Sequence, residues 1–141
     1  MRPADLDFDP DESLYRRIHP NYRTADGSIN AGYLKLPTMS VNRGRYSEPE
    51  DVVRNHPGQG IATFPVRAIP SSLRDPRESI LYEFRVEHVP EVDNYSHSEV
   101  RTYVSDERST AEPPAMIKKL FREAIRRNGL KVLVEPVASE T

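Results

Sequence analysis

The sequence has no cysteine, which excludes disulfide bonds, thiolate metal sites and cysteine nucleophiles. It also has no apolar run near the roughly 20 residues that a membrane-spanning helix needs. The first residues, MRPADLDFDPDES, are acidic and lack the apolar stretch of a signal peptide. These absences predict a small soluble protein of the cytoplasm with no membrane association.

Motifs that would identify an enzyme are missing as well. The sequence contains no P-loop, no G-x-G-x-x-G and no G-x-S-x-G. No two of its histidines have the i, i+4 spacing of a helical zinc motif, so we expect no metal site and no cofactor. The formal net charge of -2 gives no global attraction to nucleic acid. A binding protein is therefore favoured over an enzyme, although the sequence leaves both open.

What is present limits the organisation of the chain. Its 141 residues suit one domain, and the low apolar content of 36% requires some segments to lie outside the core. We expect an acidic, flexible segment at residues 1–12, one globular domain at residues 13–137 and a frayed end at residues 138–141. The 13 prolines are spread along the chain, which favours many short elements joined by rigid loops.

Hydrophobic periodicity then predicts the elements. Alternating apolar residues indicate strands at residues 13–18, 61–69, 80–89 and 97–104, with further extended pieces at residues 29–37, 38–41 and 130–137. Ser47 followed by Glu50 predicts a capped short helix at residues 47–55. A single apolar stripe predicts a long helix at residues 113–129. This order predicts an α+β fold: a mixed or antiparallel sheet with the long helix packed on it.

Polar residues gather at the expected ends of several strands. On the first strand, Arg17 and His19 share one face with Tyr15, which makes a strip that suits a phosphate or a carboxylate. The stretch DNYSHSEV places Asn94 and His97 where a loop meets a strand. The catalytic candidates are Arg17, His19, Asn94 and His97, and the ligand-binding candidates are Tyr15, Arg16, Ser40, His88 and Ser98.

Each of these features also has a structural explanation. Arg17 can form an ion pair with an acidic neighbour in the sheet, such as Glu83, Glu87 or Glu99. DNYSHSEV can be a turn that caps a strand. The leading hypothesis is therefore a module that binds a protein partner, and the alternative is an enzyme or ligand-binding domain that handles a phosphate or a nucleotide.

A third hypothesis concerns the expected long helix. One side of it carries Lys118, Lys119, Arg122, Arg126 and Arg127 against Glu123 alone. Such a face could follow a phosphate backbone, although no groove-reading motif accompanies it. Nucleic-acid binding is accordingly the least favoured of the three functions.

Four stretches together suggest a relationship. LYRRIHP, MSVNRGRYSEPEDVV, GIATFPV and NYSHSEV, in this order, resemble a family of short bacterial proteins of uncharacterised function. The resemblance covers roughly residues 13–104 and leaves out the expected long helix and last strand. It implies no activity, but it raises interest in the polar positions that fall in its motifs. These are Arg16, Arg17, His19, Ser40, Asn94 and His97.

Overall fold

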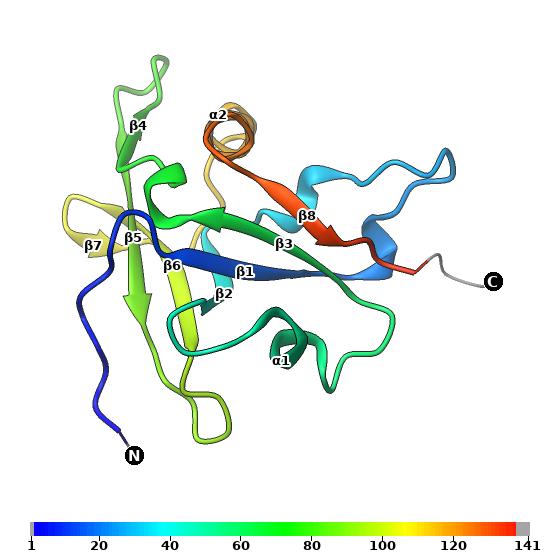
Figure 1. The fold of residues 1–141 in the computed structure, drawn as a ribbon. Coiled ribbons are helices and arrows are strands. Elements are labelled where there is room, and N and C mark those ends of the chain that lie inside the picture. The colour runs from blue at the N-terminus through cyan, green and yellow to red at the C-terminus, as the bar shows by residue number, and fades with distance from the viewer. Residues whose placement is uncertain (1, 138–141) are drawn as a thin grey trace.

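Eight strands, all paired antiparallel, form one curled sheet with the order β4-β5-β6-β2-β1-β3-β8, and β7 pairs with β6 (Figure 1). The computed structural model describes residues 2–137. The strands are β1 (Ser13–Ile18), β2 (Thr38–Arg43), β3 (Gly60–Pro65), β4 (Ser72–Arg74), β5 (Leu81–His88), β6 (His97–Val104), β7 (Glu107–Arg108) and β8 (Lys131–Val134). The helices are α1 (Pro49–Val53) and α2 (Ala115–Arg127), with 3-10 turns η1 (Pro20–Tyr22), η2 (Ala31–Tyr33) and η3 (Val66–Ala68). The predicted α+β class is confirmed.

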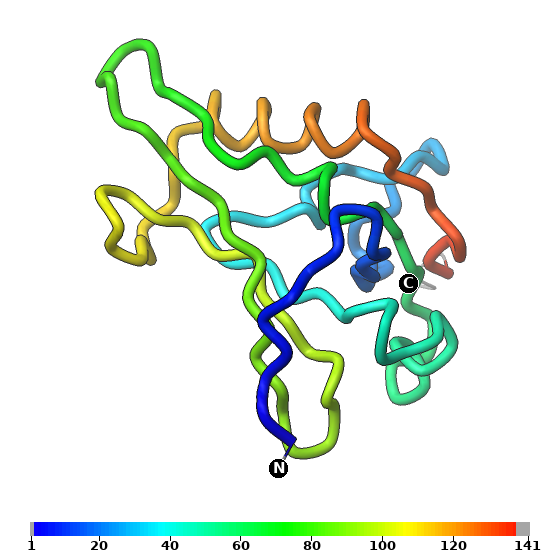
Figure 2. The backbone as a smooth tube through the Cα atoms, turned by 60° about the vertical axis from the view of Figure 1, so that its left-hand side comes forward, coloured from blue at the N-terminus to red at the C-terminus, as the bar shows by residue number. Residues whose placement is uncertain are grey.

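The long helix α2 lies along one side of the sheet and closes the core (Figure 2). Its residues Ile117, Phe121 and Ile125 are fully buried, as the apolar stripe predicts. The ring of Phe121 packs at 5.0 Å from that of Phe84 on β5. Among residues 2–137, no helix is long and apolar enough to cross a bilayer.

Alternation along β1 divides its side chains between the two faces of the sheet. Leu14 and Ile18 are fully buried on the core face, and Arg16 shares that face. Arg17 points to the opposite face and pairs in register with Ile61 of β3. The strand therefore directs the two neighbouring arginines to opposite faces of the sheet, and both still line one cavity at the end of β1.

Three local predictions were wrong. The strand predicted at residues 61–69 ends at Pro65, and residues 66–68 form the turn η3. Residues 29–37 are not extended: the Asn30 side chain accepts a hydrogen bond from the Gly32 N–H at 2.7 Å and starts the turn η2. The capping box of α1 uses Glu48 and Asp51, one residue later than expected. The Ser47 hydroxyl instead donates to the carbonyl of Arg43 at 2.7 Å, so it does not cap the helix.

The N-terminal segment runs beside the turn between β5 and β6 (Figures 1 and 2). The composition of residues 1–12 predicts an acidic, flexible segment here. The structure places its backbone and side chains around Arg43, which is fully buried at the end of β2. The Arg43 guanidinium donates to the carbonyls of Asp5 and Asp7 at 2.7 and 2.6 Å. It also stacks over the ring of Phe8, 3.9 Å from the ring centre.

Candidate functional site

Arg17 occupies an unusual position on the outer face of the sheet. It is half-buried, and its guanidinium donates one hydrogen bond, to the Val52 carbonyl of α1 at 3.4 Å. Within the described residues, no carboxylate oxygen lies within 4.0 Å of a guanidinium nitrogen of Arg17, the limit for an ion pair. Burial lowers the pKa of Arg17, and the more distant charge of Glu91 acts against that shift. The structure thus holds a partly desolvated cation without an acidic partner.

Two cavities meet at this arginine, and His56 lines both of them with Arg17. Among residues 2–137, no carboxylate lines the smaller cavity, which has a volume of about 370 Å³, and we call it the acid-free cavity. It is lined by Arg16, Arg17, His19, Asn21, Tyr22, Lys35, His56 and Gln59. The larger cavity, about 530 Å³, contains amides, hydroxyls and carboxylates, so we call it the mixed cavity.

The basic side chains of the acid-free cavity are held in different ways. Arg16 donates to the carbonyls of Tyr33 and Ser40 at 2.8 and 3.0 Å, which joins β1 to η2 and β2. His19 accepts the N–H of Asn21 on Nδ1 at 3.1 Å, which leaves Nε2 for another partner. Lys35 is exposed and lies 5.9 Å from the ring centre of Tyr22.

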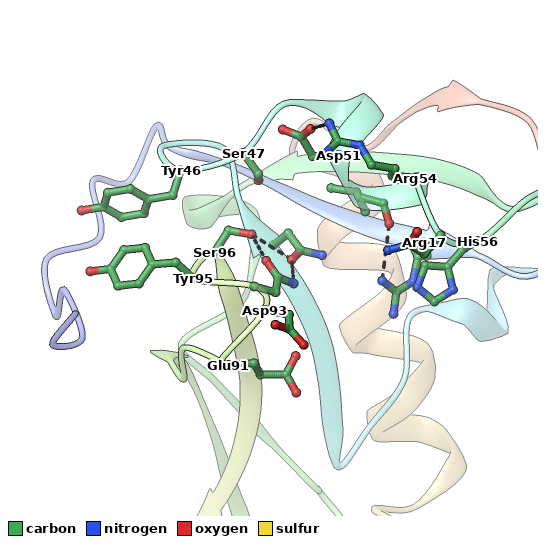
Figure 3. A pocket seen from close by; sticks show the side chains of 14 residues that line it. Arg17, Tyr46, Ser47, Asp51, Arg54, His56, Glu91, Asp93, Tyr95 and Ser96 are labelled. Carbon is green, nitrogen blue, oxygen red and sulfur yellow. Dashed lines mark hydrogen bonds and ion pairs between the residues drawn. The ribbon is translucent and has the colours of Figure 1, made fainter. Parts of the chain in front are cut away.

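His56 lies in the loop after α1, beside Arg17 (Figure 3). Burial lowers the pKa of His56, and the positive charge of Arg17 lowers it further. The imidazole is therefore neutral near pH 7. An anion bound between Arg17 and His56 would counteract the lowering of the His56 pKa by burial and by Arg17, and so favour the protonated ring.

A network of short polar side chains lines the mixed cavity (Figure 3). Asn42 on β2 accepts hydrogen bonds from the Asn94 amide at 2.7 Å and from the Ser96 hydroxyl at 3.0 Å. The Ser96 hydroxyl also lies 2.7 Å from the Asn94 carbonyl oxygen. Glu91 and Asp93 project from the same loop between β5 and β6. The side chains that line this cavity can donate hydrogen bonds to the hydroxyl groups of a ligand and accept hydrogen bonds from them.

The predicted catalytic residues divide between different places. Arg17 and His19 line the acid-free cavity, and Asn94 lines the mixed cavity with Arg17. His97 lines neither: its Nδ1 lies 2.9 Å from the Val89 carbonyl. The structure therefore does not bring His19 and His97 together.

His88 lies in a structural contact outside both cavities. Its Nδ1 accepts the N–H of Asp5 at 2.8 Å, so its Nε2 carries the proton and donates to the Tyr95 carbonyl at 2.6 Å. Both ring nitrogens are used, and the ring stacks with Tyr46. His88 thus joins the N-terminal segment to the turn between β5 and β6.

The other ligand-binding candidates outside the cavities have local roles. Ser98 is fully buried and donates to the Ser96 carbonyl at 3.3 Å. Ser40 provides the carbonyl that Arg16 binds. Tyr15 lies half-buried on the outer face, where burial and then the charges of Glu48 and Glu50 raise its pKa.

The basic face of α2 is interrupted by one inward contact. Arg122 donates to the Leu34 carbonyl at 3.1 Å, and Lys118 lies 3.8 Å from Glu112. Lys119, Arg126 and Arg127 are exposed. Nucleic-acid binding through this helix stays a prediction.

Several residues of the site have no recognisable signal in the sequence. Asn42, Lys35, His56 and Gln59 come from segments with no periodic pattern, and only tertiary packing brings them to Arg17. The excess of acid over base in residues 1–12 is a signal that could have suggested a basic partner elsewhere, but with sixteen arginines in the chain it could not have indicated Arg43. In the part of the chain that the structure describes, no group of three or more His, Asp or Glu residues is arranged to hold a metal ion.

Comparison with known proteins gives no relative. A scan against protein-family models, a search of curated proteins and a search of solved structures each find no significant match to this chain. The resemblance to a bacterial family stays a prediction, and the function has to be argued from the site itself.

Proposed function

We propose that this protein binds a small phosphorylated ligand rich in hydroxyl groups, of the sugar phosphate class, with the phosphate beside Arg17. The observation that carries the proposal is the half-buried Arg17 guanidinium, which borders the acid-free cavity and has no carboxylate within ion-pairing distance among residues 2–137. A buried cation without a counter-ion is costly, and a bound anion would offset that cost.

The surroundings of Arg17 favour an anion over a neutral ligand. Three permanent cations line the acid-free cavity: Arg16, Arg17 and Lys35. His19 and His56 can also donate hydrogen bonds, and a bound anion makes such hydrogen bonds stronger. Arginine binds phosphate and carboxylate through two parallel hydrogen bonds, which also fixes the orientation of the ligand. The anion would lie between Arg17 and His56.

The mixed cavity supports the second half of the ligand. Its volume of about 530 Å³ lies in the range of roughly 300–1,000 Å³ typical of small-molecule sites. Carboxylates such as Glu91 and Asp93 repel a phosphate but accept hydrogen bonds from hydroxyl groups. A ligand with its phosphate in one cavity and its polyol part in the other would use both linings. The proposal concerns binding and assigns no reaction.

Thermal unfolding with a panel of ligands tests the proposal. The panel contains inorganic phosphate, glucose 6-phosphate, ribose 5-phosphate and the same sugars without phosphate. A ligand present at a hundred times its Kd adds about 2.7 kcal/mol to the free energy of unfolding, which is about 10 °C in Tm for a chain of this size. We expect this shift for a sugar phosphate and not for the unphosphorylated sugar.

Two variants make the result specific. Arg17→Met should abolish the shift, while Arg67→Met, an exposed arginine outside both cavities, should preserve it. An equal shift in the Arg17→Met protein would show that the ligand binds elsewhere. If no ligand of the panel shifts the Tm, the sugar phosphate site is rejected. The hypothesis of a module that binds a protein partner is then favoured.

A further inference from the structure

The acid-free cavity extends beyond the place where the phosphate of the proposed ligand would bind. Arg17 and His56 line both cavities, so they mark the junction between them. Figure 3 shows these two side chains next to each other at one end of the mixed cavity, with Tyr46 and Tyr95 toward the other end. The rest of the acid-free cavity therefore lies on the side of the junction away from the mixed cavity. Its lining consists of Arg16, His19, Asn21, Tyr22, Lys35 and Gln59.

Two permanent cations line that further part of the acid-free cavity. Arg16 donates from Nε and Nη1 to backbone carbonyls, which are neutral, and its Nη2 has no hydrogen-bond partner among residues 2–137. Lys35 is exposed. In the described part of the chain, no carboxylate oxygen lies within 4.0 Å of a side-chain nitrogen of Arg16 or Lys35. Neither positive charge is balanced within the described fold.

The basic groups around the junction repel one another. Burial lowers the pKa of Arg16, Tyr22 acts against that shift, and the positive charge of Arg17 lowers the pKa further. A phosphate group carries about 1.5–2 negative charges at pH 7. That is less than the combined charge of Arg16, Arg17 and Lys35. One phosphate at the junction would thus leave part of the positive charge of the acid-free cavity unbalanced.

We propose that the ligand ends in a diphosphate, with its first phosphate between Arg17 and His56 and its second phosphate beside Arg16 and Lys35. The inference rests on the proposed function and narrows the ligand to a sugar diphosphate. The order of the linings supports the order of the chemical groups: hydroxyl groups in the mixed cavity, one phosphate at the junction and one phosphate beyond it. Guanidinium and ammonium groups form strong, charge-assisted hydrogen bonds with phosphate oxygens.

The lining of the mixed cavity disfavours a sugar with phosphates at its two opposite ends. With one phosphate at the junction, the second would lie in the mixed cavity, near the carboxylates of Glu91 and Asp93, which repel it. Arg54 also lines the mixed cavity, but it forms an ion pair with Asp51. Two phosphates therefore suit the two cavities only when they are adjacent.

Isothermal titration calorimetry of the full chain with inorganic phosphate and with inorganic pyrophosphate tests the second phosphate. Both titrations are made at the same ionic strength, because salt screens charged contacts. A hydrogen bond to a charged group gives at least about a tenfold gain in affinity, so pyrophosphate should bind at least about tenfold more tightly than phosphate. Arg17→Met should abolish the binding of both anions.

Failure of this inference differs from failure of the proposed function. Pyrophosphate that binds no more tightly than phosphate, or does not bind, would overturn the diphosphate. A sugar phosphate that still shifts the Tm would then leave the proposed function in place. If the proposed function itself fails, no sugar phosphate of the panel shifts the Tm and neither anion binds at Arg17.

Lys35→Met tests the position of the second phosphate. Lys35 is exposed, so the substitution should not alter the fold. It should weaken the binding of pyrophosphate by about tenfold and leave the binding of phosphate unchanged, because a single phosphate is held at Arg17 and His56. Lys119→Met removes an exposed lysine outside both cavities and should change neither Kd. Equal weakening of both anions by Lys35→Met would contradict a second phosphate beside Lys35.

Fructose 1,6-bisphosphate and fructose 6-phosphate test whether the two phosphates are adjacent. We expect the bisphosphate to bind no more tightly than fructose 6-phosphate, because its second phosphate would lie near Glu91 and Asp93. If the bisphosphate gains as much affinity over fructose 6-phosphate as pyrophosphate gains over phosphate, the site accepts separated phosphates. The assignment of a diphosphate would then be wrong.

Discussion

Arg43 and Glu12 form a bidentate ion pair. Nε and Nη2 of Arg43 donate to the two carboxylate oxygens of Glu12 at 2.8 and 2.7 Å. The Arg43 side chain is fully buried, and that of Glu12 keeps only 5% of its surface exposed. The N-terminal segment thus supplies the counter-ion of the largest buried side chain in the described fold.

Glu12→Ala should destabilise the protein strongly. The change leaves the buried Arg43 guanidinium with one acidic neighbour, Asp5 at 3.5 Å, and loss of a partner from a buried ion pair costs about 3–5 kcal/mol. The measurement is urea unfolding of the variant beside Asp11→Ala, which removes an exposed neighbouring carboxylate and should cost less than about 0.5 kcal/mol. Equal stability of the two variants would show that Arg43 does not depend on Glu12.

Asn42→Ala should also destabilise the fold, by about 1–3 kcal/mol, because it removes the acceptor shared by the buried Ser96 hydroxyl and the half-buried Asn94 amide. Asn55→Ala is the matched control, since Asn55 lines the same cavity but is exposed. Chemical unfolding of both variants compares the two sites. Losses of the same size would mean that the network around Asn42 has no stabilising role.

The pKa of His56 should lie below its ordinary value of 6.5, because burial and Arg17 both disfavour the charged ring. A folded-state pKa below the unfolded value gives a contribution to stability that is complete above about pH 6.5 and is lost as the pH falls through the folded pKa. Nuclear magnetic resonance titration of the imidazole ring measures the pKa of His56 in the folded protein. Arg17→Met should raise the pKa of His56, and Arg45→Met, outside both cavities, should not change it.

The carboxyl of Asp26 should titrate near pH 2. Its pKa is lowered from 3.8 to about 2 by hydrogen bonds from the hydroxyl of Thr24, then from the hydroxyl and N–H of Ser28. The contribution to stability is complete above pH 3.8 and is lost as the pH falls toward 2. Carbon-13 titration of the carboxyl tests this. Thr24→Val should raise the pKa, and Thr110→Val, an exposed threonine elsewhere, should leave it unchanged.

Periodic patterns made the longer elements predictable, whereas the short strands β4 and β7 were not predicted. The alternation in β5 and β6 and the apolar stripe of α2 each come from one face packing on the core, and the burial of Phe84, Val100 and Phe121 agrees. The turn η2 was not predictable in this way, because one side-chain hydrogen bond of Asn30 decides it. A hydrophobic period in the sequence reflects the burial of many residues on one face. A single polar contact produces no such period and so cannot be predicted from it.

The site was predictable only where one strand provides it. Arg17 and His19 both line the acid-free cavity, but Arg16 lines it too, so the two-residue period of β1 does not by itself select these residues. His88 and His97 lie in one hairpin, but His88 pairs with Ser98, so the alternation turns His97 to the other face. His56 and Asn42 reach the site through strand pairings between distant segments, which no local signal encodes.

The strand order also has a consequence for how the chain folds. β5 and β6 form a local hairpin, but the centre of the sheet joins distant parts of the chain, with Thr38 opposite Arg101 and Arg17 opposite Ile61. Large loops must close before these pairings stabilise anything, and sheets dominated by such contacts fold in roughly milliseconds to seconds. We therefore expect the β5–β6 hairpin to form early and the pairing of β2 with β6 to limit the folding rate.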